Sequence, residues 1–282
     1  MNMNFFWNPS DMHSVQVIIP TYNRQSTIVK CIASVLSQKH DLDLKIRIDV
    51  IENNSSDCTY ELISSTYQRE LKDGLLKIHK FDETVPIIEN WNRFSGILSL
   101  EASIIKFLWS DDYLDSSYFA VTVPVLNSGY DAVGCDLQYI NDVGHKLSIR
   151  RYSDASWALL VSPFYKNLVG CPSSLLLRRS AFDHKFNCDN RYAADLEHFL
   201  DGIFARRSQY KMVSQILVNV TLNAGTETNS LFGSNVMIDN KLNFAKHAAK
   251  TYFNWTFLAK VLCVSYAVML NLRFKYLKRF FQ

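Results

Sequence analysis

Two adjacent carboxylates, Asp111 and Asp112, are the residues of this chain that point most directly to chemistry. They lie in residues 104–114, IIKFLWSDDYL, where four of the first five residues are apolar, as in a short buried strand. A strand that ends in paired acids delivers negative charge to the edge of a sheet, where ligands bind in open α/β sheets. Carboxylate oxygens there can hold a divalent cation that neutralises a phosphate. The alternative is a solvated loop after a core strand.

Two earlier strand candidates also end in polar loops. Residues 15–19, VQVII, lead into a Pro-Thr-Tyr-Asn-Arg loop that Pro20 begins, and residues 46–51, IRIDVI, lead into a cluster of short polar side chains at 52–57. Between them, apolar residues recur at spacings of three and four, which predicts a helix after a Ser or Thr cap. A strand, a loop, a helix and a second strand predict a βαβ unit at the start of the chain.

The remaining pattern predicts mixed structure after the central strand. We expect helices over residues 59–71, 90–100, 116–126 (broken near Pro124) and 195–204, and strands over 75–79, 131–136, 173–177 and 213–220, with a hairpin over 138–149 that turns at Asn141-Asp142. The alternation of strands and helices argues for a parallel sheet in the N-terminal half, with a mixed portion added later.

Composition bounds the class of protein. The chain has 282 residues, 48% of them hydrophobic and 20% charged, which suits one or two globular domains. A net charge of +3 is too small to argue for a nucleic-acid partner. The six cysteines form no CxxC pair and the N-terminal residues resemble no secretory signal, so we expect reduced thiols in a cytoplasmic protein.

The C-terminal segment differs from the rest. We divide the chain into a catalytic domain, residues 1–225, and a helical tail, residues 226–282, that is basic and aromatic toward its end. Within the tail, residues 256–272 are nearly apolar but contain Lys260, and a basic flank follows. This composition is typical of a helix on an anionic membrane surface. Packing on the domain and a true membrane span are the alternatives.

Taken in order, four segments resemble the family 2 glycosyltransferases of the GT-A fold. Residues 15–38 are similar to that family's opening strand, Pro-Thr-Tyr-Asn loop and first helix, and residues 50–59 to its second strand and acidic loop. Residues 107–114 resemble its Asp-x-Asp region, and residues 192–200, YAADLEHFL, its later segment with the catalytic Asp. The resemblance covers residues 14–205 and implies an α/β fold of the GT-A type, with a Rossmann-like, mostly parallel sheet flanked by helices.

The resemblance also implies a nucleoside-diphosphate sugar donor, with a UDP-sugar favoured. The donor-binding residues that it implies are Pro20, Thr21, Tyr22, Asn23, Glu52, Asn54, Trp91, Arg93, Ser110 and Asp111. Glu52 stands where the family usually has an Asp, and either carboxylate can accept hydrogen bonds from a base or a ribose. Packing alone for Tyr22, capping alone for Glu52 and a surface position for Arg93 remain alternatives.

The metal region departs from the family pattern. Trp109 replaces the first Asp of the Asp-x-Asp motif, so Asp111 becomes the principal ligand of Mn²⁺ or Mg²⁺, together with Asp112. The lost carboxylate weakens such a site, although these ions keep several waters and also bind substrate phosphates.

Asp195 is the residue to which the resemblance assigns catalysis. It opens a predicted helix whose N-terminal dipole favours the ionised carboxylate, as a general base requires. A base on the face opposite the leaving group gives inversion at the anomeric carbon, the outcome that the family implies. Arg178 and Glu197 are acceptor-side candidates, and Glu197 is the alternative base. A merely structural helix acid at Asp195 and a plain surface charge at Arg178 remain open.

These features predict an inverting glycosyltransferase that acts on a glycan or lipid-linked acceptor. Such an enzyme would assemble cell-surface polysaccharide (O-antigen of lipopolysaccharide, capsule or similar) at the inner face of the cell membrane. A nucleotidyltransferase is one alternative, but it usually needs a Gly-rich basic loop after the first strand, which residues 20–24 do not provide. The other is a catalytically inactive nucleotide-sugar-binding module with the same fold, which the loss of the Asp at Trp109 favours.

Overall fold

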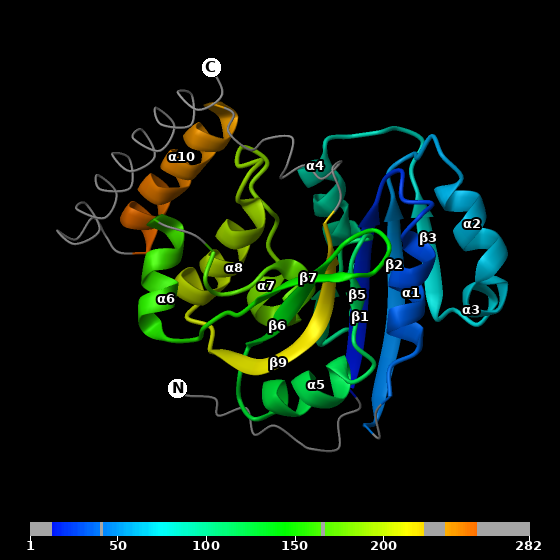
Figure 1. The fold of residues 1–282 in the computed structure, drawn as a ribbon, viewed down its shortest axis with the longest axis horizontal. Coiled ribbons are helices and arrows are strands. Elements are labelled where there is room, and N and C mark those ends of the chain that lie inside the picture. Colours follow the sequence, from blue (N-terminus) through cyan, green and yellow to red (C-terminus); the bar gives the residue numbers. More distant parts are fainter. Residues whose placement is uncertain (1–12, 40–41, 165–166, 223–234, 253–282) are drawn as a thin grey trace.

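The first half of the chain forms a parallel sheet with crossover helices. The computed structural model describes residues 13–39, 42–164, 167–222 and 235–252. The strands β1 (His13–Thr21), β2 (Leu44–Glu52) and β3 (Leu76–Lys80) are parallel neighbours, connected by α1 (Ile28–Leu36), α2 (Thr59–Thr66) and α3 (Gln68–Lys72). Parallel strands need such crossovers, and Figure 1 shows these helices at the β1–β3 end of the molecule. The predicted βαβ start is confirmed.

The central strand of the whole sheet is β4 (Ile104–Phe107), which is also the last strand of the parallel half. It pairs with β1 on the side opposite β2 and is buried along its whole length. The chain reaches it through α4 (Ile87–Asn92) and the 3₁₀ turn η1 (Arg93–Gly96). This helical region begins and ends earlier than the predicted range 90–100, because Pro86 suits a helix start and the helix tightens into the 3₁₀ turn after Asn92.

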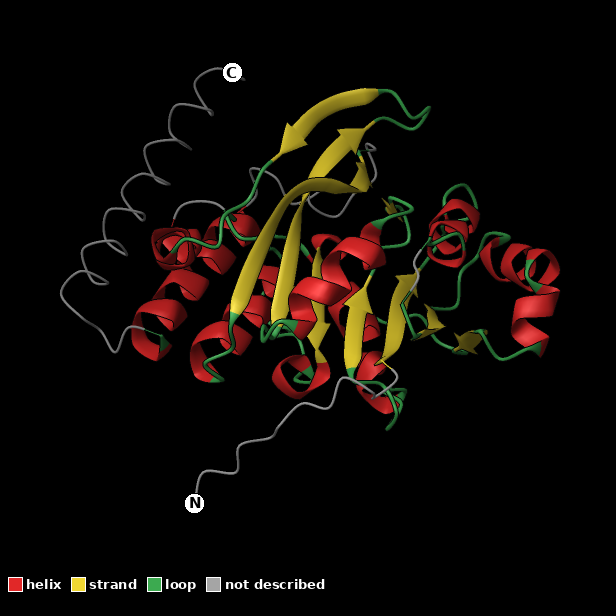
Figure 2. Cartoon of the chain, turned by 90° about the horizontal axis from the view of Figure 1, so that it is seen from below, coloured by secondary structure: helices red, strands yellow, loops and turns green. Residues whose placement is uncertain are grey.

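The second half completes a mixed sheet. Its elements are β5 (Tyr113–Leu114), α5 (Tyr118–Asn127), β6 (Ala132–Ile140), β7 (Lys146–Arg150), α6 (Ser156–Val161), η2 (Ser162–Phe164), η3 (Pro172–Ser174), β8 (Leu175–Arg178), α7 (Arg179–Phe182), α8 (Ala194–Ala205), β9 (Tyr210–Thr221) and α10 (Asn235–Thr251). The strand order is β3-β2-β1-β4-β8-β6-β9-β5, with β7 paired to β6. β8 is antiparallel to β4 and β6, whereas β6 and β9 are parallel. The α/β fold with helices around the sheet is confirmed (Figure 2).

Three local expectations were wrong in detail. β1 continues through Pro20, which pairs with Ile51, because a proline at a strand end removes a single donor. The predicted helix over residues 59–71 divides at Tyr67, whose hydroxyl donates to the Val29 carbonyl at 2.7 Å. α5 does not break at Pro124 but runs on to Asn127, since its buried face packs against the sheet.

The sheet separates two hydrophobic core layers. Alternate residues of β1 point to opposite layers, with Val15 and Val17 in one and Ile18 in the other. The first layer contains the buried face of α1, and the second contains the buried residues of α8. Because both faces are covered, β1 and β4 read as almost continuous apolar runs. Burial of each large aliphatic side chain contributes roughly 1.5–3 kcal/mol.

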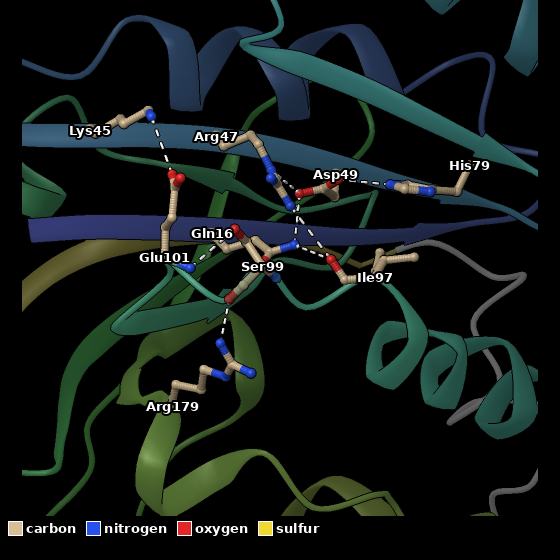
Figure 3. A network of polar contacts seen from close by, with 9 residues as sticks. All are labelled: Gln16, Lys45, Arg47, Asp49, His79, Ile97, Ser99, Glu101 and Arg179. Atoms are coloured by element: carbon tan, nitrogen blue, oxygen red, sulfur yellow. Dashed lines mark hydrogen bonds and ion pairs between the residues drawn. The ribbon is translucent and has the colours of Figure 1, made fainter.

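A buried polar network joins the parallel strands β1, β2 and β3 (Figure 3). The Asp49 carboxylate of β2 is fully buried and accepts hydrogen bonds from Gln16 and from Arg47, each at 2.8 Å. His79 Nε2 lies 2.7 Å from the same carboxylate. Burial alone raises the pKa of Asp49, but the hydrogen bonds from His79 and Arg47 outweigh it and hold that pKa below its usual value. The network therefore fixes β1, β2 and β3 to one another through one charged group.

The helix α8 is held from two sides. Gly202 lets Phe182 of α7 approach the helix backbone, since a Cβ at Gly202 would lie 2.2 Å from the Phe182 ring. On another side, the Tyr252 hydroxyl donates to Asp201 at 2.7 Å, and His247 Nε2 of α10 lies 3.4 Å from the same carboxylate. α10 is thus attached to the body that carries the sheet.

The described ranges contain no helix with the length and apolar composition needed to cross a membrane. The apolar stretch 256–272 and its basic flank, on which the membrane predictions depend, lie outside the described residues.

Candidate active site

A cavity of about 670 Å³ opens where the carboxyl ends of β1, β2 and β4 meet. Four chain segments supply most of its wall: residues 20–24 at the end of β1 and just after it, Asn53 after β2, residues 109–112 after β4, and residues 191, 192, 194 and 195 around the start of α8. Residues of the segment 84–91, which includes Trp91 of α4, complete it together with residues of β6, Cys171 and the end of β9. Because parallel strands end at the same edge, residues far apart in the sequence converge there. A cavity of this volume accommodates a nucleotide-sized ligand.

The loop after β1 is tied to the loop after β2. Asn23 adopts the left-handed conformation (φ 51°), which asparagine tolerates better than most residues. Its backbone N–H donates to Ser55 Oγ at 3.0 Å, and its side-chain oxygen accepts from the Ser56 backbone N–H at 2.8 Å. The Arg24 N–H donates to Thr59 Oγ1 at 2.8 Å. The predicted donor residues all line the cavity, Pro20 and Thr21 from the end of β1 and Tyr22 and Asn23 from this loop.

The second predicted donor loop is arranged differently from the expectation. Glu52 is fully buried, lies outside the cavity wall, and accepts hydrogen bonds from the backbone N–H groups of Asn54 (3.2 Å) and Ser55 (2.7 Å). Asn54 is also outside the wall and takes a left-handed conformation with φ 58°. The residue that faces the cavity is Asn53, which lies between them. The Glu52 carboxylate therefore caps backbone N–H groups of this loop, which is the alternative role considered for it from the sequence.

Arg93 lies behind Asn53 rather than in the cavity wall. Its guanidinium donates to the Asn53 side-chain oxygen at 2.9 Å and stacks 3.8 Å from the centre of the Phe81 ring. The Asn53 amide in turn donates to the Val85 carbonyl at 2.8 Å. Arg93 therefore orients a residue that lines the cavity.

The paired acids face the cavity from the centre of the sheet. The Asp111 carboxylate lies 3.6 Å from the Arg24 guanidinium, and Asp112 is almost fully buried. Burial raises the pKa of Asp111, and the charge of Arg24 opposes this rise. Burial and the neighbouring Asp111 raise the pKa of Asp112 well above its usual value, against hydrogen bonds from Ser173 and the Thr221 amide. Two crowded carboxylates of this kind are stabilised by a cation.

The donor set fits Mn²⁺ or Mg²⁺, because both ions prefer carboxylate oxygens and complete their shells with water and phosphate oxygens. Asp111 and Asp112 are the residues that would hold the ion. In the described ranges, no third carboxylate, imidazole or thiolate joins them.

A buried lysine stabilises the region next to the two acids. Lys106 of β4 is fully buried and donates to the Tyr118 hydroxyl at 2.9 Å, the Leu175 carbonyl at 3.1 Å and the Ser173 carbonyl. Burial lowers its pKa to about 8. Since Ser173 also bonds Asp112 and the Trp109 N–H, Lys106 fixes the turn that supports this loop.

Asp195 lines the same cavity from the first turn of α8. Its carboxylate accepts a hydrogen bond from the Leu196 backbone N–H at 2.8 Å. Burial nevertheless raises its pKa above the usual value. A carboxylate that is raised in pKa and open to a cavity is a stronger proton acceptor than a free aspartate, which suits a general base.

The two acceptor-side candidates do not reach the cavity wall. The Arg178 side chain donates to the carbonyls of Tyr130 (2.9 Å) and Leu126 (3.0 Å). Arg178 pairs with Ile104 at the start of β4, so it lies at the opposite edge of the sheet. Glu197 faces away from the cavity, where its carboxylate accepts from Asn187 (2.9 Å) and Asn190 (2.5 Å).

Sequence reasoning missed several residues of the wall, among them Arg24, Asn53, Tyr139, Arg191 and Tyr192. Arg24 and Asn53 each adjoin a predicted donor residue, so their position along the chain was an available signal. Tyr139 faces the cavity from β6, which no local pattern indicates.

Comparison with known proteins identifies the family. The sequence model of glycosyl transferase family 2 matches residues 16–186, more than half of the chain. A curated relative from Campylobacter jejuni, GalNAc(5)-diNAcBac-PP-undecaprenol beta-1,3-glucosyltransferase, is 31% identical over 120 residues. That alignment covers 42% of this chain and 36% of the relative, so the chain matches about a third of the relative's length.

Solved structures share the fold at low identity. Residues 1–349 of S. aureus TarS, in complex with UDP-GlcNAc, superpose with a TM-score of 0.65 at 16% identity, over 84% of this chain and 67% of that one. The mannosyltransferase PcManGT from Pyrobaculum calidifontis, in complex with GDP-Man and Mn²⁺, gives 0.60 at 15% identity, over 86% and 66%.

Proposed function

Because this chain belongs to glycosyl transferase family 2, a family of nucleotide-sugar-dependent enzymes, we propose that its cavity binds a nucleoside-diphosphate sugar and transfers the sugar to an acceptor hydroxyl with inversion. One observation carries the proposal. Asp111 after β4 and Asp195 of α8 line a single cavity of about 670 Å³. A nucleotide grip, a charged region for the diphosphate and a base for the acceptor are what such a transfer needs.

The donor lies along the loops after β1 and β2. Residues 20–23 and Asn53 contact the nucleoside, and the Arg24 and Asp111 side chains lie beside the diphosphate. A UDP-sugar is the favoured donor, which the UDP-GlcNAc complex of the fold relative TarS supports. Mn²⁺ or Mg²⁺, held by Asp111 and Asp112, neutralises charge on the leaving diphosphate when bound, and the Mn²⁺ in the PcManGT complex supports this choice.

Asp195 performs the proton transfer. Its carboxylate accepts the proton of the acceptor hydroxyl while the hydroxyl oxygen forms a bond to the anomeric carbon. The bond between that carbon and the phosphate oxygen breaks, and the nucleoside diphosphate leaves with the electron pair. Attack on the face opposite the leaving group inverts the anomeric configuration.

The acceptor is a glycan or a lipid-linked glycan of cell-surface polysaccharide assembly. The C. jejuni relative is named for an acceptor glycan linked to PP-undecaprenol, which supports a lipid-linked acceptor. We place the enzyme peripherally at the inner membrane face, with residues 1–225 as the catalytic domain and the tail 226–282 as its membrane contact. Equal sedimentation of the full chain with phosphatidylglycerol and with phosphatidylcholine vesicles would argue against that contact.

The reaction is tested by incubating the full chain with UDP-glucose, UDP-N-acetylglucosamine, UDP-galactose and GDP-mannose, with Mn²⁺ or Mg²⁺ and a membrane lipid extract as acceptor. We expect one donor to be consumed, the reaction to stop with chelator, and the product to have the anomeric configuration opposite to that of the donor by NMR. Retained configuration contradicts the assignment of Asp195 as a base. Donor binding without turnover favours the inactive binding module.

A further inference from the structure

Two tryptophans form a stacked pair in the cavity wall. Trp91 of α4 and Trp109 after β4 both line the cavity, and their ring centres lie 4.3 Å apart with an angle of 20° between the planes. They belong to two different segments of the chain. We call the pair the indole platform.

The indole platform is the half-exposed end of a buried aromatic cluster. Trp91 contacts Phe186 edge-on at 5.4 Å, and Phe186 in turn contacts Phe94 at 6.0 Å and Phe107 at 5.3 Å. These three phenylalanines are almost fully buried. The cluster holds the two indoles in place, since aromatic pairs of this geometry add to the stabilisation from burial.

The backbone of Trp109 is fixed as well. Its N–H donates to Ser173 Oγ at 3.2 Å, and its carbonyl accepts from the Asp112 N–H at 2.9 Å and from the Cys31 thiol at 3.6 Å. A rigid side chain on a rigid backbone loses little conformational freedom when a ligand binds. The platform is therefore preorganised.

The position of the platform selects the kind of ligand. Trp109 immediately precedes Ser110 and Asp111, the diphosphate region, and the same cavity holds Asp195. Between the diphosphate and the base lies the sugar that is transferred. A pyranose ring carries its hydroxyls around the rim and C–H groups on its faces, so a flat apolar surface complements one face, as aromatic side chains do in other ligand pockets.

We propose that the indole platform, Trp91 and Trp109, binds the C–H face of the donor's sugar ring, a role that rests on the proposed function. At Trp109 no carboxylate is present to accept a hydrogen bond from a sugar hydroxyl. Apolar contact with the ring replaces that polar contact. The sugar is therefore bound more through the face of its ring and less through its hydroxyl groups. The platform thus contributes to sugar binding and leaves the nucleoside to the loops after β1 and β2.

The test compares nucleotide with nucleotide sugar. Affinities of the full chain for UDP and UDP-N-acetylglucosamine, and for GDP and GDP-mannose, are measured by calorimetry for the wild type, Trp109→Ala and Trp109→Phe. For the pair that the wild type binds, Trp109→Ala lowers the affinity for the nucleotide sugar about ten-fold and changes the affinity for the nucleotide by less than about two-fold. Trp109→Phe, which keeps an aromatic face, loses less.

Trp157→Ala is the matched control, because Trp157 of α6 is 58% exposed and lies outside the cavity wall. An unchanged thermal midpoint shows that each variant is folded. The exciton-coupled circular dichroism of the stacked indoles should be lost in Trp109→Ala and kept in Trp157→Ala. If Trp109→Ala binds nucleotide and nucleotide sugar equally more weakly, or binds both as the wild type does, the platform proposal is wrong and the proposed function still stands. A wild type that binds no nucleotide or nucleotide sugar overturns the proposed function and the platform with it.

Discussion

Asp195 and Glu197 are two positions apart on one helix and have different surroundings. Residues two apart on an α-helix point in nearly opposite directions. Asp195 faces the cavity, whereas Glu197 accepts hydrogen bonds from Asn187 and Asn190 on the other side of the helix. Glu197 is also one of three groups, with Asp201 and His247, whose ligand atoms lie within 4.8 Å of one another. The direction of each side chain therefore separates the two candidate bases.

Asp111 is the carboxylate whose loss should show most clearly in metal dependence. In Asp111→Asn one anionic ligand becomes a neutral amide, and Arg24 loses its partner at 3.6 Å. We expect the Mn²⁺ concentration for half-maximal activity to rise about 10–100-fold. Titration of Mn²⁺ against initial rate measures this shift.

Asp142→Asn is the control for that titration, since Asp142 is an exposed acid in the β6–β7 turn. An unchanged Mn²⁺ requirement in Asp111→Asn would mean that Asp111 is not a ligand.

The sequence predicted the site residues for which the position in a motif also determines where the side chain points. The Pro-Thr-Tyr-Asn loop, Ser110, Asp111 and Asp195 line the cavity as a strand–loop–helix reading suggests. Glu52 and Arg93 do not line it, because their directions depend on hydrogen bonds with Ser55 and Asn53 that no local pattern encodes. Lys106 stood alone in an apolar run, and its partners at Ser173 and Leu175 come from a distant turn.

Among the elements, β2 carries the group on which the parallel half most depends. Asp49 is fully buried with Gln16, Arg47 and His79 around it (Figure 3). In Asp49→Asn the N–H groups of the new amide face the N–H groups of Gln16 and Arg47, and the charge of Arg47 loses its partner. We expect the free energy of unfolding at pH 7 to fall by about 3 kcal/mol, measured by urea denaturation followed by far-UV circular dichroism.

The pH dependence of that difference follows from the lowered pKa of Asp49. A carboxyl whose folded pKa lies below its unfolded value, about 3.9, stabilises the fold above that value. This contribution is lost as the pH falls through the folded pKa. The gap between wild type and Asp49→Asn should therefore be constant near neutral pH and shrink below about pH 4.

Glu101→Gln provides the matched comparison in the same region. Lys45 and Glu101 form an exposed ion pair at 3.4 Å, drawn in Figure 3, and such pairs contribute about 0–1 kcal/mol. Similar losses of stability in both variants would contradict the role assigned to the buried network.

Element types were predictable and element limits were less so. The short apolar runs identify β1 and β2, which are buried on both faces, and the period-3.6 patterns identify α1 and α8, which each bury one apolar face. Pro20 was expected to end its strand and Pro124 to break its helix, yet the chain continues through both without interruption. The hairpin that joins β6 and β7 was predicted, with its turn at Asn141-Asp142. The pairing of β6 with β8 and β9 was beyond prediction, since it depends on contacts between strands far apart in the sequence.

At the scale of the whole molecule, the two halves of the sheet contribute different parts of one site. The parallel half presents the loops after β1, β2 and β4, and the later half supplies α8 with Asp195 and the end of β9. Figure 1 shows these halves side by side, with α1 to α3 at one end and α6, α8 and α10 at the other. Donor binding and proton transfer should therefore be separable by mutation.

The rate of sugar transfer and the donor affinity of Asp195→Asn, measured together against the wild type, test this account most directly. Loss of the base should lower the transfer rate about 10²–10⁴-fold, whereas donor affinity should change by less than about two-fold. Glu197→Gln should keep most of the transfer activity. Transfer at the wild-type rate in Asp195→Asn, or its loss in Glu197→Gln alone, would contradict the assignment of Asp195 as the base.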